Sequence, residues 1–249
     1  MASVSKRARA FKQPKGGYIS PKSFKVIEKN NDKLVLGEAP ENLGGWIVGT
    51  AVDYLTRTLL ASDPLKGFKI SLLGAKLARE GDLAIKKAES ITDLSAKSIV
   101  TACKLVGYDN CYRAGKPPVK NIMPDENTIK NIEIMVNRAL QFFDEYGPIT
   151  KDGFTFEGGY TNIVRTGDGD FITTDTLWDF KVSKYEPKSE HTLQLLMYYL
   201  MGLRSIHEDL HRIKHLGIFN PRLNKVYLLN VSDISPKVIE AVEKDVIGY

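Results

Sequence analysis

The sequence predicts an α/β protein in which a mixed β-sheet is flanked by helices and carries a helical insertion. Apolar residues recur at helical spacing through much of the chain up to about residue 146. After Gly147-Pro148, short runs rich in aromatic and β-branched residues alternate with turn residues, around one apolar helical pattern. This order of elements is typical of helices packed on a sheet. With 249 residues, of which 43% are hydrophobic, the chain can bury its own core.

The first 27 residues form a basic segment. They contain seven lysine or arginine residues and no acidic residue: Lys6, Arg7, Arg9, Lys12, Lys15, Lys22 and Lys25. The net charge of the whole chain is +5. Such a segment suits a polyanion, because each phosphate that it neutralises releases counterions, but a solvated tail is an alternative interpretation. We expect a basic, partly flexible arm over residues 1–27 and a single domain over residues 28–249.

Composition excludes several protein classes. No apolar run approaches the roughly 20 residues of a membrane helix, and the N-terminal segment lacks the apolar region of a secretory signal. The two cysteines, Cys103 and Cys111, match no metal-ligand spacing. We therefore expect a reduced, cytoplasmic protein that has no disulfide framework and does not enter a membrane.

The elements before Gly147 are mostly helical. A short strand is expected at residues 33–37, followed by a helix over residues 43–60, in which apolar residues keep helical spacing. Ser62-Asp63-Pro64 should end that helix. The segment at about residues 65–146 is interpreted as a helical insertion.

The elements after Gly147 alternate strands with helices. A strand with a bulge is predicted over residues 154–165, and strands at 170–173 and 177–182 complete an antiparallel meander. A helix capped by Ser189 follows. Strands at 216–219 and 225–229 and a closing helix after Ser235-Pro236 complete the predicted order.

Charged residues concentrate in the hairpin of this meander. Asp179 and Lys181 are two residues apart on a strand and share one face, whereas Trp178 and Phe180 point to the opposite face. Asp170 begins the preceding strand and can lie opposite Asp179. Two converging carboxylates repel unless a cation lies between them, and oxygen ligands suit Mg²⁺ or Mn²⁺.

The charged residues of the hairpin have two other interpretations. Asp179 and Lys181 can form an ordinary surface ion pair, because such pairs are common. A calcium loop starting at Asp168 would need a ligand and a glycine at its fifth and sixth positions, where the chain has Ile172 and Thr173. The calcium interpretation therefore fails.

Three segments together resemble the RecB-type branch of the PD-(D/E)XK nuclease superfamily. Gly167 through Ile172 resembles its G-x-x-D strand, Trp178 through Lys181 its hydrophobic-D-hydrophobic-K strand, and Gln194 through Tyr198 its Q-x-x-x-Y helix. The resemblance covers about residues 150–232 and the helix at 43–60.

The resemblance implies a restriction-endonuclease-like core and a Mg²⁺- or Mn²⁺-dependent nuclease that hydrolyses phosphodiester bonds. We expect the substrate to be DNA, although the sequence does not distinguish DNA from RNA. The resemblance also implies that Asp170 and Asp179 bind the metal and that Lys181 positions water or stabilises charge. Gln194 and Tyr198 would contact the substrate strand or support the lysine, and Asp168 would support the site. Without the hairpin, Gln194 and Tyr198 would be interpreted as ordinary core residues, since they lie one turn apart on an apolar helix.

A further ligand is implied on the first helix, where Gly49 through Asp53 resembles the branch's G-x-x-(H/E) element. An ion pair of Asp53 with Arg57, four residues on, explains Asp53 equally well. Glu38 or Glu41 is then the alternative ligand. Relatives with an iron–sulfur cluster need four cysteines, so no cluster is expected here.

A competing motif lies at residues 207–211, where His207, Glu208 and His211 form a literal H-E-x-x-H. On a helix this spacing binds zinc in metalloproteases. The motif follows a predicted helix end, and His215 is not at a protease ligand spacing. A zinc metalloprotease is thus a weaker alternative, as is a non-catalytic nucleic-acid-binding protein on a nuclease scaffold.

Overall fold

The computed structural model describes residues 2–29 and 35–249, and the chain divides into two compact units. We call Met1–Asn30 with Phe143–Tyr249 the sheet unit, and Asn31–Phe142 the helical unit. Among the described residues, no helix has the length and apolarity that crossing a membrane requires.

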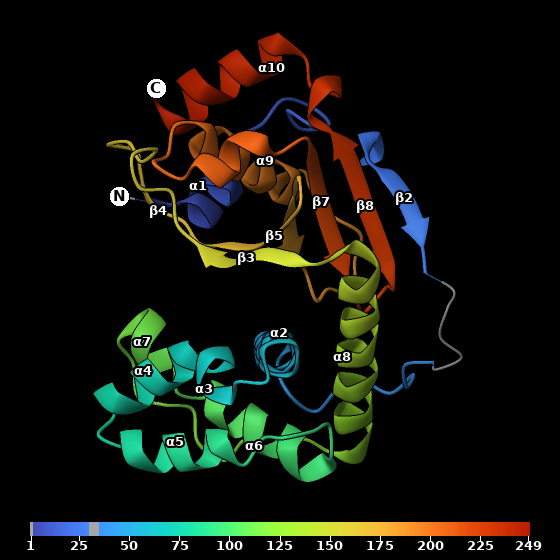
Figure 1. Ribbon diagram of the computed structural model, residues 1–249, viewed down its shortest axis with the longest axis vertical. Helices are drawn as coiled ribbons and strands as arrows, with labels where there is room; N and C mark the ends of the chain where they lie inside the picture. Colours follow the sequence, from blue (N-terminus) through green and yellow to red (C-terminus); the bar gives the residue numbers. More distant parts are fainter. Residues whose placement is uncertain (1, 30–34) are drawn as a thin grey trace. The chain divides into compact units, whose positions relative to one another are not determined.

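The sheet unit is built on a six-stranded mixed sheet with the order β2-β8-β7-β6-β5-β3 (Figure 1). Strands β6 and β7 run parallel, and the other neighbouring pairs are antiparallel. The strands are β2 (Lys25–Glu28), β3 (Ile149–Phe154), β5 (Gly169–Thr173), β6 (Thr176–Phe180), β7 (His215–Asn220) and β8 (Lys225–Asn230). Two short strands, β1 (Ala2–Ser3) and β4 (Val164–Thr166), pair separately in parallel. The expected α/β class with a mixed sheet is confirmed.

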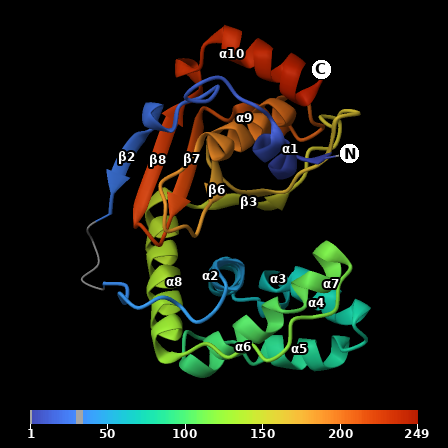
Figure 2. The same ribbon diagram turned by 180° about the vertical axis from the view of Figure 1, so that it is seen from behind.

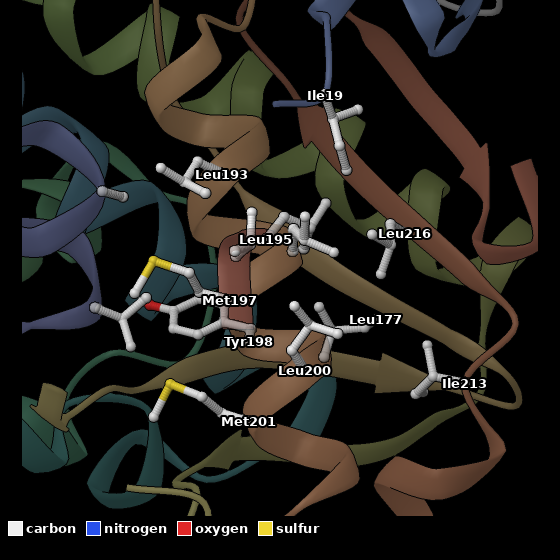
Figure 3. Close-up of a cluster of buried hydrophobic side chains, with 14 of the residues drawn as sticks. Ile19, Leu177, Leu193, Leu195, Met197, Tyr198, Leu200, Met201, Ile213 and Leu216 are labelled. Carbon is white, nitrogen blue, oxygen red and sulfur yellow. The ribbon is translucent and has the colours of Figure 1, made fainter. Parts of the chain in front are cut away.

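Helices of the sheet unit cover the sheet and share its core. They are α1 (Val4–Ala10), α9 (Ser189–Leu203), α10 (Pro236–Ala241) and the π-helical η4 (Val242–Ile247), with 3-10 turns η1 (Pro21–Ser23), η2 (Glu208–Arg212) and η3 (Val231–Asp233). Seen from behind, α1 and α9 lie side by side next to the sheet (Figure 2). Figure 3 shows α9 side chains, including Leu195 and Met197, packed among those of Leu177 and Leu216. An apolar surface nearly all round α9 explains why this helix is buried.

The opposite face of the central strands carries aromatic side chains. The ring of Trp178 lies 5.3 Å from that of Tyr146, and the ring of Phe171 lies 4.8 Å from that of Phe143. Phe180 packs against Phe171 at 6.2 Å. The strand pleat therefore separates the aromatic residues from Asp179 and Lys181, as the sequence predicts.

The helical unit contains α2 (Gly45–Ala61), α3 (Pro64–Gly67), α4 (Lys69–Leu77), α5 (Gly81–Glu89), α6 (Ala96–Val106), α7 (Asp109–Ala114) and most of α8 (Glu126–Tyr146). Helix α2 ends where expected. Ser62 adopts a left-handed conformation with φ of 50°, and the Asp63 side chain caps α3, which begins with Pro64.

The basic N-terminal segment differs from the expected flexible arm. It contains helix α1, whose Val4 and Ala8 are buried, and the edge strand β2. The Arg7 guanidinium donates to the carbonyls of Val246 and Asp245 at 2.9 Å each, which ties α1 to the end of the chain. In the sequence, the basic residues around them obscured these two small apolar residues, which lie one helical turn apart.

Two strand predictions also need correction. Residues 33 and 34 of the strand expected at 33–37 lie outside the described residues, and residues 35–37 are not a strand. The first meander strand is Ile149–Phe154 rather than 154–165. The glycine pair after it lies in a loop, where Gly158 has φ of +89° and a side chain on Gly159 would meet the Met201 carbonyl at 2.2 Å. That loop returns to β4, which pairs with β1 instead of the main sheet.

The remaining strands and helices lie close to their predicted positions, with one change at α9. Its N-cap is Lys188 rather than Ser189, and the Lys188 amide donates to His191 Nδ1 at 3.1 Å.

Candidate functional site

The candidate site starts at the β5–β6 hairpin. The antiparallel register pairs Phe171 with Trp178, so one step further along the strands Asp170 faces Asp179. The backbone amide of Phe180 donates to Asp170 Oδ2 at 2.8 Å. This hydrogen bond fixes one carboxylate at the start of β5, beside the end of β6 where the second one lies.

Asp179 is the most buried charged group of the hairpin, with 1% of the residue exposed. Its Oδ1 accepts hydrogen bonds from Lys181 Nζ at 2.9 Å and from Gln194 Nε2 at 3.2 Å. Its Oδ2 is buried and has no hydrogen-bond partner among the residues that the structure describes. A buried carboxylate oxygen without a donor is costly, so this atom is suited to bind a cation.

Lys181 continues β6 beyond its last residue, because its amide donates to the Phe219 carbonyl at 3.0 Å. Its side chain is 27% exposed. Burial opposes the charged form of this lysine, but the charges of Asp179 and Asp170 outweigh it and raise the pKa of Lys181. The side chain is therefore an ammonium at neutral pH, which can stabilise negative charge but cannot accept a proton.

Gln194 and Tyr198 lie one turn apart on α9, on the side that meets Asp179. Gln194 Nε2 donates to the Tyr198 hydroxyl at 3.1 Å as well as to the Asp179 carboxylate. The Tyr198 ring stacks on Phe156 at 5.1 Å, and Figure 3 shows the ring among the core side chains of α9. Burial and the charges of Asp170 and Asp179 raise the pKa of Tyr198, so the hydroxyl keeps its proton. Gln194 thus connects the carboxylate to a neutral hydroxyl.

Helix α1 adds two residues that sequence reasoning did not single out, Ser5 and Arg9. Ser5 acts on the Tyr198 hydroxyl in the sense that lowers the pKa of Tyr198, and the charge of Arg9 acts on both Lys181 and His191. Ser5 and Arg9 are four residues apart, so both lie on the face of α1 that is turned toward the site. This i, i+4 spacing within the basic segment was the available signal.

His191 is a third residue that the sequence did not indicate. Burial and the nearby Lys181 charge lower the pKa of His191 to about 4. Its Nδ1 accepts from the Lys188 amide, which is consistent with a neutral ring at the first turn of α9. His191 lies just before the Gln194–Tyr198 motif in the sequence, but no sequence pattern distinguished this histidine.

Asn220 positions the chain after Lys181. This buried residue donates from Nδ2 to the Ser183 carbonyl at 2.9 Å and accepts at Oδ1 from the Arg222 amide at 3.0 Å. It therefore joins the segment leaving β6 to the β7–β8 turn.

The other predicted site residues belong to other elements of the chain. Asp168 is exposed in the short connection between β4 and β5. Asp53 lies on α2 of the helical unit, where its Oδ1 pairs with Arg57 Nε at 2.8 Å, and Glu41 accepts from Asn131 in the same unit at 3.0 Å. The predicted ion pair of Asp53 is present, and its role as a ligand stays a prediction.

The H-E-x-x-H segment does not form the helix that a zinc site needs. Residues 208–212 form the 3-10 helix η2, and His207 precedes it in an extended conformation. His207 Nε2 lies 2.8 Å from Glu157 Oε2. A turn of α-helix is what brings histidines four apart to one metal, so this geometry does not support the zinc alternative.

The residues of the hairpin fit a divalent cation through two carboxylates. Among the described residues, no group of three or more His, Cys, Asp or Glu side chains is close enough to bind a metal. Mg²⁺ is commonly bound through one or two carboxylates, with water and substrate phosphates as the other ligands. The unpartnered Asp179 Oδ2 beside Asp170 meets that requirement.

Comparisons with protein-family models, with curated proteins and with solved structures found no match.

Proposed function

We propose that the protein is a Mg²⁺- or Mn²⁺-dependent nuclease with a restriction-endonuclease-like core, and that it hydrolyses phosphodiester bonds in DNA. The observation that carries the proposal is the buried, unpartnered Oδ2 of Asp179, which lies in a carboxylate that also contacts the Lys181 ammonium. A structural ion pair would satisfy both carboxylate oxygens, because unsatisfied buried polar atoms are costly.

Each residue of the site has a role in the proposed reaction. Asp179 and Asp170 bind the cation, which when bound neutralises the scissile phosphate and acidifies water. The Lys181 ammonium stabilises the charge that develops on the phosphate oxygens during attack. Gln194 holds the Asp179 carboxylate in place through Oδ1, which leaves Oδ2 as the atom that would hold the cation.

Helix α1 supplies the contacts to the substrate strand. Arg9 carries a positive charge close to Lys181, and guanidinium groups bind phosphate through paired hydrogen bonds. The Tyr198 hydroxyl accepts from Gln194, so its own proton remains available to donate to a phosphate oxygen. The basic N-terminal segment thus contributes to the site as a folded helix.

The proposal is tested by incubating the full chain with Mg²⁺ or Mn²⁺ and linear or circular DNA, single- and double-stranded. We expect cleavage that EDTA abolishes and that Asp179→Asn, Asp170→Asn and Lys181→Ala each abolish. Asp175→Asn is the matched control, because Asp175 lies at the turn end of the same hairpin and pairs with His215. Cleavage unchanged by Asp179→Asn or Lys181→Ala would refute this site.

A direct metal measurement complements the cleavage assay. Electron paramagnetic resonance of Mn²⁺ should show binding to the unaltered chain and to Asp175→Asn, and a loss of binding in Asp179→Asn. Nucleic-acid binding without cleavage would support the non-catalytic alternative. RNA cleaved in preference to DNA would correct the substrate.

A further inference from the structure

The helical unit contains a cavity that is independent of the hairpin site. It has a volume of about 490 Å³ and lies between the last turns of α5 and α6 and the segment at residues 118–123. Helices α5 and α6 lie next to each other in this unit (Figure 1). The volume falls within the range of roughly 300–1,000 Å³ that small-molecule sites occupy.

The charges that line the cavity are unbalanced. Lys87, Lys104 and Lys120 contribute three ammonium groups, and Glu80 contributes one carboxylate. Both oxygens of Glu80 are engaged, Oε1 with Lys120 Nζ at 2.9 Å and Oε2 with the Tyr108 hydroxyl. Lys120 therefore neutralises Glu80, and Lys87 and Lys104 form no ion pair among the described residues, which leaves an excess of about two positive charges.

The rest of the lining is apolar or can form hydrogen bonds without charge. Val119 and Met123 line the cavity and are 38% and 60% exposed, beside the buried Ile122 and the ring of Tyr108. Asn121 adds an amide with both a donor and an acceptor. The cavity therefore combines cationic groups with an apolar wall and one amide, a pattern that fits a ligand with an anionic group and a body that has an apolar face and polar edge atoms.

The wall of the cavity is fixed by contacts of its own. The Val119 amide donates to the Gly107 carbonyl at 3.0 Å, and the Asn110 side chain donates to the Pro117 carbonyl at 2.6 Å. A Cβ on Gly107 would lie 2.3 Å from the Val119 carbonyl oxygen. Glycine at this position allows the 118–123 segment to pack directly on the end of α6, so the site is formed before any ligand arrives.

We propose that this cavity binds a nucleoside monophosphate group, with the phosphate between Lys87 and Lys104 and the base against Val119 and Met123. A phosphomonoester carries a charge of about −1.5 to −2 at neutral pH, which matches the excess positive charge of the lining. An internal phosphodiester carries one negative charge and would leave the excess uncompensated. The group belongs either to a free mononucleotide or to a phosphorylated strand end.

The test is a calorimetric titration of the full chain with 2′-deoxyadenosine 5′-monophosphate in EDTA. We expect saturable binding that Lys87→Ala and Lys104→Ala each weaken about tenfold or more, because each removes a charge-assisted hydrogen bond. Lys97→Ala is the matched control, since Lys97 is exposed on the same helix α6 but does not line the cavity. That variant should bind within about twofold of the unaltered chain, as expected for a distant surface charge.

Further arms identify the source of the nucleotide. A 5′-phosphorylated oligonucleotide that displaces the mononucleotide, when its 5′-hydroxyl counterpart does not, supports a strand end. Binding of the mononucleotide alone supports a free ligand.

Four results would overturn the proposal: no saturable binding at millimolar nucleotide, equal binding of deoxyadenosine without phosphate, equal binding of inorganic phosphate, or equal weakening by Lys97→Ala. The Asp179→Asn variant should bind the nucleotide normally, so this proposal and the nuclease proposal can fail separately.

Discussion

Each unit of the molecule buries an aspartate among hydrogen-bond donors. The two aspartates differ in whether both carboxylate oxygens accept a hydrogen bond. Asp109 of the helical unit is 3% exposed, and both of its oxygens are satisfied: Oδ1 accepts from Ser71 at 2.6 Å, and Oδ2 accepts from Tyr54 at 2.7 Å and Arg113 at 3.3 Å. Asp179 of the sheet unit is 1% exposed, and its Oδ2 has no partner among the described residues.

This difference in hydrogen bonding distinguishes Asp109, a structural carboxylate, from Asp179, a carboxylate that is suited to bind a ligand. Asp109 joins α2, α4 and α7 through Tyr54, Ser71 and its own helix, and burial together with the Asp109 charge raises the pKa of Tyr54. Both carboxylate oxygens of Asp109 are occupied by donors that the fold itself supplies. Asp179 is held through one oxygen, and the other oxygen is left for something that the folded chain does not supply.

The largest expected effect comes from Asp179→Asn. Cleavage should fall at least about 10²–10³-fold, because the substitution removes the charge that the proposed cation needs. The free energy of unfolding should change by less than about 1 kcal/mol, since Lys181 is partly exposed and can be hydrated. Initial cleavage rates and urea unfolding measure the two quantities. A large loss of stability with normal cleavage per folded molecule would assign Asp179 to the structural class.

Asp109→Asn should give the opposite pattern. We expect the free energy of unfolding to fall by about 2 kcal/mol, because the charged acceptor shared by Ser71, Tyr54 and Arg113 is lost. Cleavage per folded molecule should be unchanged. Urea unfolding followed by circular dichroism measures the effect, and an unchanged unfolding midpoint would contradict the structural role.

Tyr198→Phe tests the hydroxyl that Gln194 links to the Asp179 carboxylate. The ring keeps its stacking on Phe156, and one hydrogen bond contributing about 1 kcal/mol is lost. We expect cleavage to fall by about tenfold, with most of the change in kcat/KM. Tyr199→Phe is the control, because Tyr199 is the next residue on α9 and belongs to the margin of the hydrophobic core. Equal effects of the two variants would exclude a specific role for the Tyr198 hydroxyl.

The smallest expected effect is a pH dependence from His191. The pKa of His191 in the folded chain, about 4, lies below the value of about 6.5 for an exposed imidazole. The unfolded chain therefore binds more protons than the folded chain between these pH values. The contribution of His191 to the free energy of unfolding is fully present above about pH 6.5 and declines as the pH falls toward 4.

Between pH 7 and pH 5, the free energy of unfolding should decline by about 1 kcal/mol less in His191→Gln than in the unaltered chain. This value is reduced to allow for partial exposure of the ring. Unfolding free energies at several pH values measure it. His211→Gln, at an exposed histidine of η2, is the control. The same decline in His191→Gln and in the unaltered chain would show that His191 does not titrate as described.

Much of the site's arrangement could be predicted from local sequence. The pleat of β6 determines that Asp179 and Lys181 share a face, and the turn between β5 and β6 sets the register that places Asp170 opposite Asp179. Helical spacing determines that Gln194 and Tyr198 share a face of α9. These relations depend on neighbours within a few residues, so the sequence alone specifies them.

Tertiary structure decided what local patterns could not. The basic segment is a folded helix because Val4 and Ala8 find a core that other elements build, and Arg7 finds carbonyl partners more than 230 residues away in the chain. The partners of Ser5, Arg9 and His191 depend on the packing of α1 on α9. Above all, the sequence determined that two carboxylates and a lysine would meet, whereas only the packed structure decided that one oxygen of Asp179 is buried without a donor. Burial and hydrogen bonding are properties of all the neighbours in space, and those of Asp179 include α9 and β7, which lie outside the hairpin.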